Sequence, residues 1–268
     1  MKNLILFITI TCISQIANAQ MSDKLPTTSL KDLKLRGHVK EVVDSGYVGE
    51  LLQVKIDTMH VYYTTTMKFD EKGNETGETT QYGDKTLNSK SSYNYIDKKT
   101  LIVNRTSTDS KFFDISIFKY NENGKKIECD YSANFIQNDV PDTTFGKYIY
   151  KYDTINKRTE VAIQRKDTVE NEKIIFLFND KHENIETDIY NSRGILYYKT
   201  VSYYDRYGNK TKSENYLFGQ PTGGNTSTYN KVDHNGNWKL KISQDYLGPN
   251  STGGVVQKEF IKRTIIYY

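Results

Sequence analysis

A six-residue motif recurs along the chain and constrains its fold more than any other feature. In its four clearest copies an apolar residue precedes Asp or Asn, and Gly follows three residues later, as in Tyr204-Asp-Arg-Tyr-Gly-Asn209. With three weaker copies included, the second positions of the motif fall at 70, 96, 121, 153, 179, 205 and 233, so the period is near 26 residues. A steady period of this length indicates a chain of structural repeats.

The motif has the chemistry of a turn. Asp or Asn at the second position can accept hydrogen bonds from the backbone of its own turn, and Gly supplies the positive φ that a tight turn requires. Where Gly is missing, Asn156 and His182 occupy its place, and both residue types tolerate positive φ. We therefore expect structural turns, and no catalytic site, at Asp70, Gly73, Asn121, Gly124, Asp153, Asn156, Asn179, His182, Asp205, Gly208, Asp233 and Gly236.

Each period also contains a second, looser turn, so one unit is predicted to hold two strands. The fold expected for residues 35–268 is all-β, an extended antiparallel meander of about seven two-stranded units in a curved or twisted sheet. Only 36% of the residues are hydrophobic, whereas 22 are tyrosines, so tyrosine must supply much of the buried area. The pattern does not say whether the sheet closes or stays open.

The N-terminus has the features of a secretory signal peptide. A basic start precedes the apolar run 4–10, and Ala17-Asn-Ala19 offers small residues before a cleavage site. The run is too short to span a bilayer, so no transmembrane segment is expected after cleavage. The predicted divisions are a signal peptide at 1–19, a linker at 20–34 and the repeat domain at 35–268. The mature chain keeps one cysteine, Cys129, and therefore no internal disulfide.

Charge and motifs exclude several functional classes. The net charge of +4 is well mixed and contains no basic run of the kind that follows nucleic acid. The four histidines fall in no metal-binding spacing, and no nucleophile elbow or phosphate loop is present. We therefore predict a non-enzymatic protein without cofactor or metal.

Trp238, the single tryptophan, follows the last copy of the motif. Two roles are open for it. It could stack against a sugar or an aromatic partner, or it could cover the end of the sheet as a terminal repeat must. The covering role is the favoured interpretation.

The motif copies resemble the tyrosine–aspartate (YD, or RHS-like) repeats of secreted bacterial proteins. A closer likeness is to small exported repeat proteins of Bacteroidetes, most of them of unassigned function. Their opening element is similar to Leu35-Arg-Gly-His-Val-Lys-Glu-Val42, and their ending is similar to Gly236-Asn-Trp238 with the tail 258–268. The resemblance covers about residues 33 to 268 and implies a repeat sheet without a known activity.

Three functions follow as hypotheses. The leading one is an exported, non-enzymatic scaffold or binding surface at the cell envelope, either periplasmic or associated with the outer membrane or cell surface. Its partner would be an unknown protein or glycan, because tyrosine-rich strands offer rigid, amphipathic contacts. The second is a secreted carbohydrate-active enzyme with its site near residue 140 or in 218–228. The third is an antitoxin or immunity-type binder of exported toxins.

Overall fold

The computed structural model of the chain describes residues 30, 33–49, 61–83, 88–107, 112–137, 140–166, 172–248 and 258–268. The predicted signal peptide and most of the predicted linker lie outside the described residues. Within the described chain almost all backbone is β-strand, in agreement with the all-β expectation.

Sixteen strands follow one another along the described residues, and each is antiparallel to the next. In chain order they are β1 (Val39–Gly49), β2 (Val61–Phe69), β3 (Glu75–Tyr82), β4 (Asn88–Tyr95), β5 (Thr100–Ser107), β6 (Phe112–Tyr120), β7 (Lys126–Gln137), β8 (Val140–Asp153), β9 (Arg158–Arg165), β10 (Glu172–Phe178), β11 (Asn184–Tyr190), β12 (Leu196–Tyr204), β13 (Lys210–Leu217), β14 (Gln220–Val232), β15 (Trp238–Leu247) and β16 (Lys258–Tyr267).

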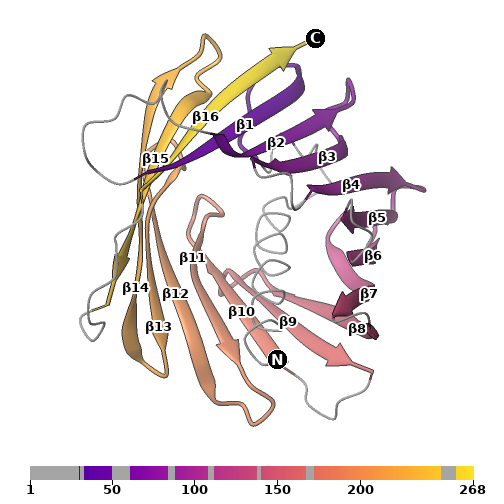
Figure 1. The fold of residues 1–268 in the computed structure, drawn as a ribbon. Helices are drawn as coiled ribbons and strands as arrows, with labels where there is room; N and C mark the ends of the chain where they lie inside the picture. The colour runs from indigo at the N-terminus through magenta and orange to yellow at the C-terminus, as the bar shows by residue number, and fades with distance from the viewer. Residues whose placement is uncertain are drawn as a thin grey trace.

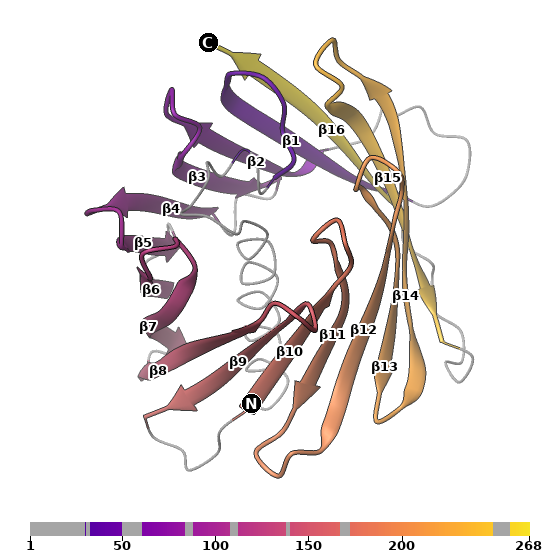
Figure 2. The same cartoon turned by 180° about the vertical axis from the view of Figure 1, so that it is seen from behind.

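The sheet closes on itself. β1 pairs with β2 on one side and with β16 on the other, so that Val42 lies opposite both Met67 and Ile265. Figures 1 and 2 show this seam, where the first and last strands of the chain lie side by side. The expected extended meander of YD-like units is therefore wrong: the sixteen strands form one closed barrel. Closure removes both sheet edges, whose unpaired backbone groups are a liability in an open sheet.

The seven motif copies all connect an even-numbered strand to the next odd-numbered one, so they share one end of the barrel, which we call the turn rim. In the copy at 205–209, Gly208 N–H donates to the Asp205 carbonyl at 3.1 Å, and Asn209 N–H donates to Asp205 Oδ1 at 2.9 Å. Positive φ occurs at four motif glycines and also at His182. In the copy at 153–157 it falls on Lys157, and not on Asn156 as expected. The four glycines are Gly73, Gly124, Gly208 and Gly236.

The two faces of the wall can be traced from the strand register. One continuous row of paired residues is Val42, Met67, Glu78, Ser91, Arg105, Asp114, Ala133 and Thr144. Most of that row is buried, and its face is the inner one, which encloses the lumen. The neighbouring residues of these strands form the opposite row, which faces outward: Lys68, Gly77, Ser92, Asn104, Ile115, Ser132 and Phe145.

Apolar packing is concentrated in three clusters on the inner face, and the smallest, Leu101, Val103 and Tyr120, lies on β5 and β6. The largest cluster spans β7 to β11 and contains Tyr148 and Tyr150, so tyrosine does contribute to the core. Cys129 belongs to this cluster, and its side chain is buried. The second cluster joins β1 and β2 to Leu30 and Leu35 of the preceding segment.

Candidate functional site: the lumen and the strap across its rim

Residues 33–38, which we call the strap, cross the turn rim before the chain enters β1. Arg36 N–H donates to Asn237 Oδ1 at 2.8 Å, and Asn237 Nδ2 donates back to the Arg36 carbonyl at 2.9 Å. Just before the strap, Leu30 N–H donates to the Gly73 carbonyl at 3.3 Å. This segment therefore contacts turns from well-separated parts of the barrel and covers part of this opening.

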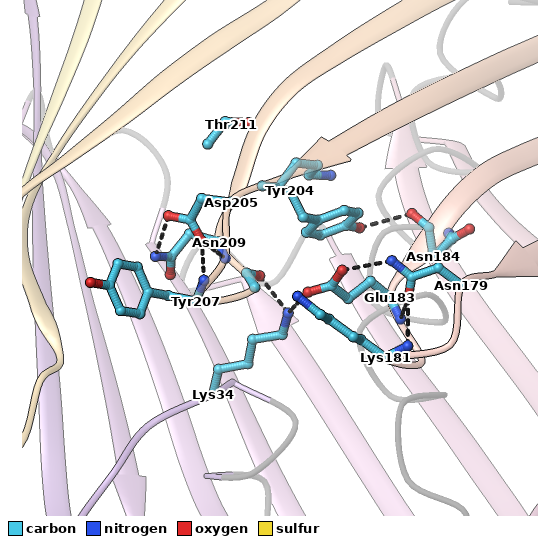
Figure 3. A network of polar contacts seen from close by, with 12 residues as sticks. Lys34, Asn179, Lys181, Glu183, Asn184, Tyr204, Asp205, Tyr207, Asn209 and Thr211 are labelled. Atoms are coloured by element: carbon cyan, nitrogen blue, oxygen red, sulfur yellow. Dashed lines mark hydrogen bonds and ion pairs between the residues drawn. The ribbon is translucent and has the colours of Figure 1, made fainter.

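Lys34 fastens the strap to the turns that join β10 to β11 and β12 to β13 (Figure 3). Its ammonium donates to the Gly208 carbonyl and lies 3.6 Å from Glu183 Oε1. The Glu183 carboxylate is buried and also accepts from Asn179 Nδ2 at 2.7 Å. Burial lowers the pKa of Lys34, and attraction to Glu183 opposes that shift only in part.

The turn carboxylates are held in the ionised state by their own turns. Burial raises the pKa of Asp205, but hydrogen bonds from Asn209, Tyr207 and Gly208 outweigh it, and the net shift is downward. Asp233 has a lowered pKa for the same reasons, with a further hydrogen bond from Tyr267. The Asp and Asn residues expected at these turns thus accept hydrogen bonds from the backbone of their own turns at the rim.

The lumen is too wide to be filled by wall side chains alone. An eight-stranded barrel is just wide enough for its interior side chains to fill, and diameter grows with strand number. Lys210 illustrates this, because its side chain faces inward and is nevertheless exposed. Over β3 to β6 the inner wall carries polar side chains beside the Leu101, Val103 and Tyr120 cluster, and Arg105 Nη1 lies 3.1 Å from Asp114 Oδ2. It is also polar over β13 to β16 and β1, where Arg263 binds Asp44 through two hydrogen bonds of 2.7 and 2.6 Å.

The outer wall carries charged side chains at mid-strand. Lys147 Nζ lies 3.0 Å from Glu128 Oε2 and 3.4 Å from Asp130 Oδ1, across β7 and β8. Lys199 Nζ of β12 lies 2.9 Å from Glu186 Oε1 of β11. Outward positions of β2, β3 and β4 are mostly Thr, Ser, Gly and Lys. The outer wall thus carries charged and polar side chains at mid-strand together with exposed apolar ones such as Phe145.

Trp238 does not cover the end of a sheet, because the closed barrel has no such end. Its ring lies under the Arg263 guanidinium, 3.7 Å from centroid to Cζ, and packs against Tyr229 at 5.6 Å. Both regions considered for an enzyme site lie largely in the wall, in β8 and β14. No group of three metal-binding side chains occurs in the part of the chain that the structure describes. Among those same residues, no helix is long and apolar enough to cross a membrane.

Sequence reasoning did not single out Lys34, Lys210 or Lys241 as site residues. The positions of Lys210 and Lys241 depend on which face of each strand turns inward, and the position of Lys34 depends on which turns the strap meets. The sequence does not show the inward face, because both faces of these strands carry polar residues. It does not show the contacts of the strap either, because the turns that Lys34 meets are distant in the sequence.

The closed, wide, antiparallel barrel defines the class of this protein, and one solved structure has a similar fold. No model of a protein family matches the chain, and no curated protein matches it. A porin-like protein from Bacteroides vulgatus is similar in structure, with a TM-score of 0.50 and 11% identity over 87% of this chain and 99% of that one. A porin-like protein from Bacteroides uniformis gives a TM-score of 0.40 and 11% identity over 85% of this chain and 98% of that one.

These findings overturn two further expectations. The identification as a YD or RHS-like repeat protein is wrong, because the chain has the fold of a porin-like barrel. The proposed scaffold or binding sheet is also wrong, since closure turns one whole face of that sheet into a lumen. The periodic turns are real features of the chain, but they serve as the hairpin connections of one barrel rim.

Proposed function

We propose that the chain is an exported, porin-like barrel that takes small hydrophilic solutes into its lumen. The observation that carries this proposal is the closed sixteen-strand wall with a lumen lined in large part by polar side chains. A barrel of this strand number leaves aqueous space inside. Holding a solute needs no catalytic group, so a non-enzymatic role is part of the proposal.

One form of this function is a channel across the outer membrane, and the likeness to the Bacteroides vulgatus porin-like protein favours it. The outer wall favours a second form, in which the barrel stands in water and holds the solute. Transmembrane barrels present an apolar band to lipid, and each Lys or Arg at its midplane costs about 2–4 kcal/mol. Lys147 and Lys199 occupy mid-strand outward positions.

The strap also favours the form in which the barrel holds the solute. It crosses the turn rim and is fastened there by Lys34. A solute would therefore enter and leave on the side away from the strap, and through-passage would require the strap to move. We accordingly place the protein in the cell envelope as a solute-holding barrel, with the membrane channel as the second candidate.

Lysine labelling tests access to the lumen. The native mature protein is treated with acetic anhydride, or with an amine-reactive ester attached to a large dextran, and mapped by mass spectrometry. Inward Lys210 and Lys241 should react with the small reagent only, whereas outward Lys212 should react with both. Failure of the small reagent to modify either inward lysine would overturn the proposal.

Reconstitution separates the two forms. Purified protein is offered to lipid bilayers and to liposomes, and conductance and solute-driven swelling are measured. The water-standing form predicts no stable conductance and a protein that stays soluble without detergent. Steady single-channel steps, together with a need for detergent, would instead establish the membrane channel.

A further inference from the structure

The inner wall holds basic side chains in two different states. Its arginines are each paired with a carboxylate across a neighbouring strand, and the inward Lys126 lies over the Phe118 ring at 4.7 Å. The nitrogen–oxygen distances of the pairs are 3.1 Å for Arg105–Asp114, 3.0 Å for Arg165–Glu172 and 2.6 Å for Arg263–Asp44. These charges are neutralised by the protein itself and are not available to a ligand.

Lys210 of β13 and Lys241 of β15 are different. Within the residues that the structure describes, neither ammonium forms a hydrogen bond or an ion pair. The two lysines flank Tyr229 of β14, which lies directly opposite Lys241 in the strand register. Tyr229 also donates from its hydroxyl to the Lys210 carbonyl at 3.0 Å. The three side chains therefore stand next to one another on the inner face.

The two lysine charges act on each other. Loss of bulk water around them lowers the pKa of both lysines, and repulsion from Lys241 adds to the shift at Lys210. Glu259, Asp44 and Asp245 attract Lys241, and Asp245 accepts a hydrogen bond from Asn225 Nδ2 at 2.7 Å. Asp44 is bound by Arg263, while Glu259 accepts a hydrogen bond from the Tyr63 hydroxyl at 3.0 Å. Like charges placed side by side destabilise a sheet unless an opposite charge joins them. Among the described residues, none of these carboxylates lies within ion-pair distance of either ammonium, so both lysines remain open to an anion in the lumen.

The surrounding wall holds Tyr229 in place. Trp238 packs between Arg263 and Tyr229, with ring contacts of 3.7 and 5.6 Å. Arg263 is fixed in turn by Asp44, which is almost fully buried. This stack fixes Tyr229 at the centre of the site, while both ammonium groups keep the freedom of their long side chains.

We propose that Lys210, Tyr229 and Lys241 form a lumenal site for a small solute that carries an oxyanion, either a carboxylate or a phosphate. Each ammonium would donate to one anionic oxygen, and these charge-assisted hydrogen bonds are stronger than neutral ones. The inference rests on the proposed function, because the solute must reach the lumen. It adds the class of solute to that function.

Calorimetric titration tests the site with three probes: inorganic phosphate, glucuronate and neutral glucose. We expect phosphate or glucuronate to bind and glucose not to bind, with weaker binding at higher salt. Whichever anion binds more tightly identifies the chemistry that the site prefers. Lys210→Gln and Lys241→Gln should each weaken anion binding by about tenfold or more, since a hydrogen bond to a charged group contributes that much.

Lys212→Gln is the matched control, because Lys212 lies on the same strand as Lys210 but faces outward and pairs with Glu214 at 2.7 Å. It should leave anion binding unchanged. Equal losses in all three variants, or no anion binding at all, would overturn the site. If acetic anhydride still modifies the inward lysines in that case, access to the lumen stands and only the site fails. If those lysines are not modified, the proposed function fails as well.

Discussion

At the residue scale, two glycines with similar backbone conformations have different surroundings. Gly194 has φ +74 and nothing within 4 Å of the position that a Cβ would take. Gly208 has φ +83, but a Cβ there would lie 2.6 Å from Lys34 Nζ and 2.8 Å from Glu183 Oε1. The first glycine serves only its own turn, whereas the second also makes room for the strap.

Asparagine substitutions should separate these two requirements. Asn tolerates positive φ, so Gly194→Asn should change the free energy of unfolding by less than about 0.5 kcal/mol. Gly208→Asn should cost about 1–3 kcal/mol, because its side chain must displace Lys34 or strain the turn. Urea denaturation of both variants measures the difference. Equal changes in the free energy of unfolding for the two variants would mean that Lys34 of the strap does not pack against Gly208.

The turn carboxylates make a further prediction at this scale. Because the folded-state pKa of Asp205 lies below that of an unfolded Asp, about 3.9, its ionised form stabilises the fold. That contribution is present above about pH 4 and is lost as the pH falls through the folded-state value. Asp205→Asn keeps the amide-accepting oxygen, as Asn121 does in its own turn. We expect it to flatten the loss of stability in acid, as measured by thermal melts between pH 2 and pH 7, and an unchanged acid profile would contradict this.

At the element scale, the strap links parts of the barrel that are distant in sequence. Lys34 meets turns about 150 to 175 residues further along the chain. Its ion pair is only partly buried, so a modest contribution to stability is expected. The strap nevertheless links the start of β1 to the turns before β11 and β13.

Lys34→Met should therefore loosen the strap more than it destabilises the barrel. We expect a loss of about 1 kcal/mol in unfolding free energy and faster proteolytic cleavage near residues 33–38. Lys72→Met, at an exposed turn position, is the control and should change neither. Unchanged cleavage in the Lys34 variant would show that the strap is held by Arg36 and the leucine contacts alone.

At the scale of the whole molecule, closure depends on the pairing of β1 with β16. The fifteen pairings between consecutive strands would be the same in an open sheet, but the β1–β16 seam would not exist there. Its register runs from Val39 opposite Tyr267 to Gly49 opposite Lys258, and the Asp44–Arg263 pair crosses it.

Hydrogen exchange measured by mass spectrometry tests closure directly. In a closed barrel the amides of β1 and β16 have partners on both sides, so they should be protected to the same degree as those of inner strands such as β9. An open sheet would leave one row of amides in each terminal strand unprotected. Rapid exchange confined to residues 39–49 and 258–267 would therefore argue against the barrel.

Sequence alone determined the local structure of this protein. In the motif at 204–209, the Asp205 side chain accepts hydrogen bonds from the turn and Gly208 takes the positive φ that the turn requires. Because the motif recurs about every 26 residues, it predicts a series of antiparallel hairpins. Only the tertiary structure decided that β1 meets β16, that Lys210 and Lys241 face a lumen, and that Lys34 needs the space beside Gly208. Turn chemistry acts within a few residues, whereas closure depends on twist and register accumulated over the whole sheet. Because both faces of these strands carry polar residues, the sequence pattern could not say which face would turn inward.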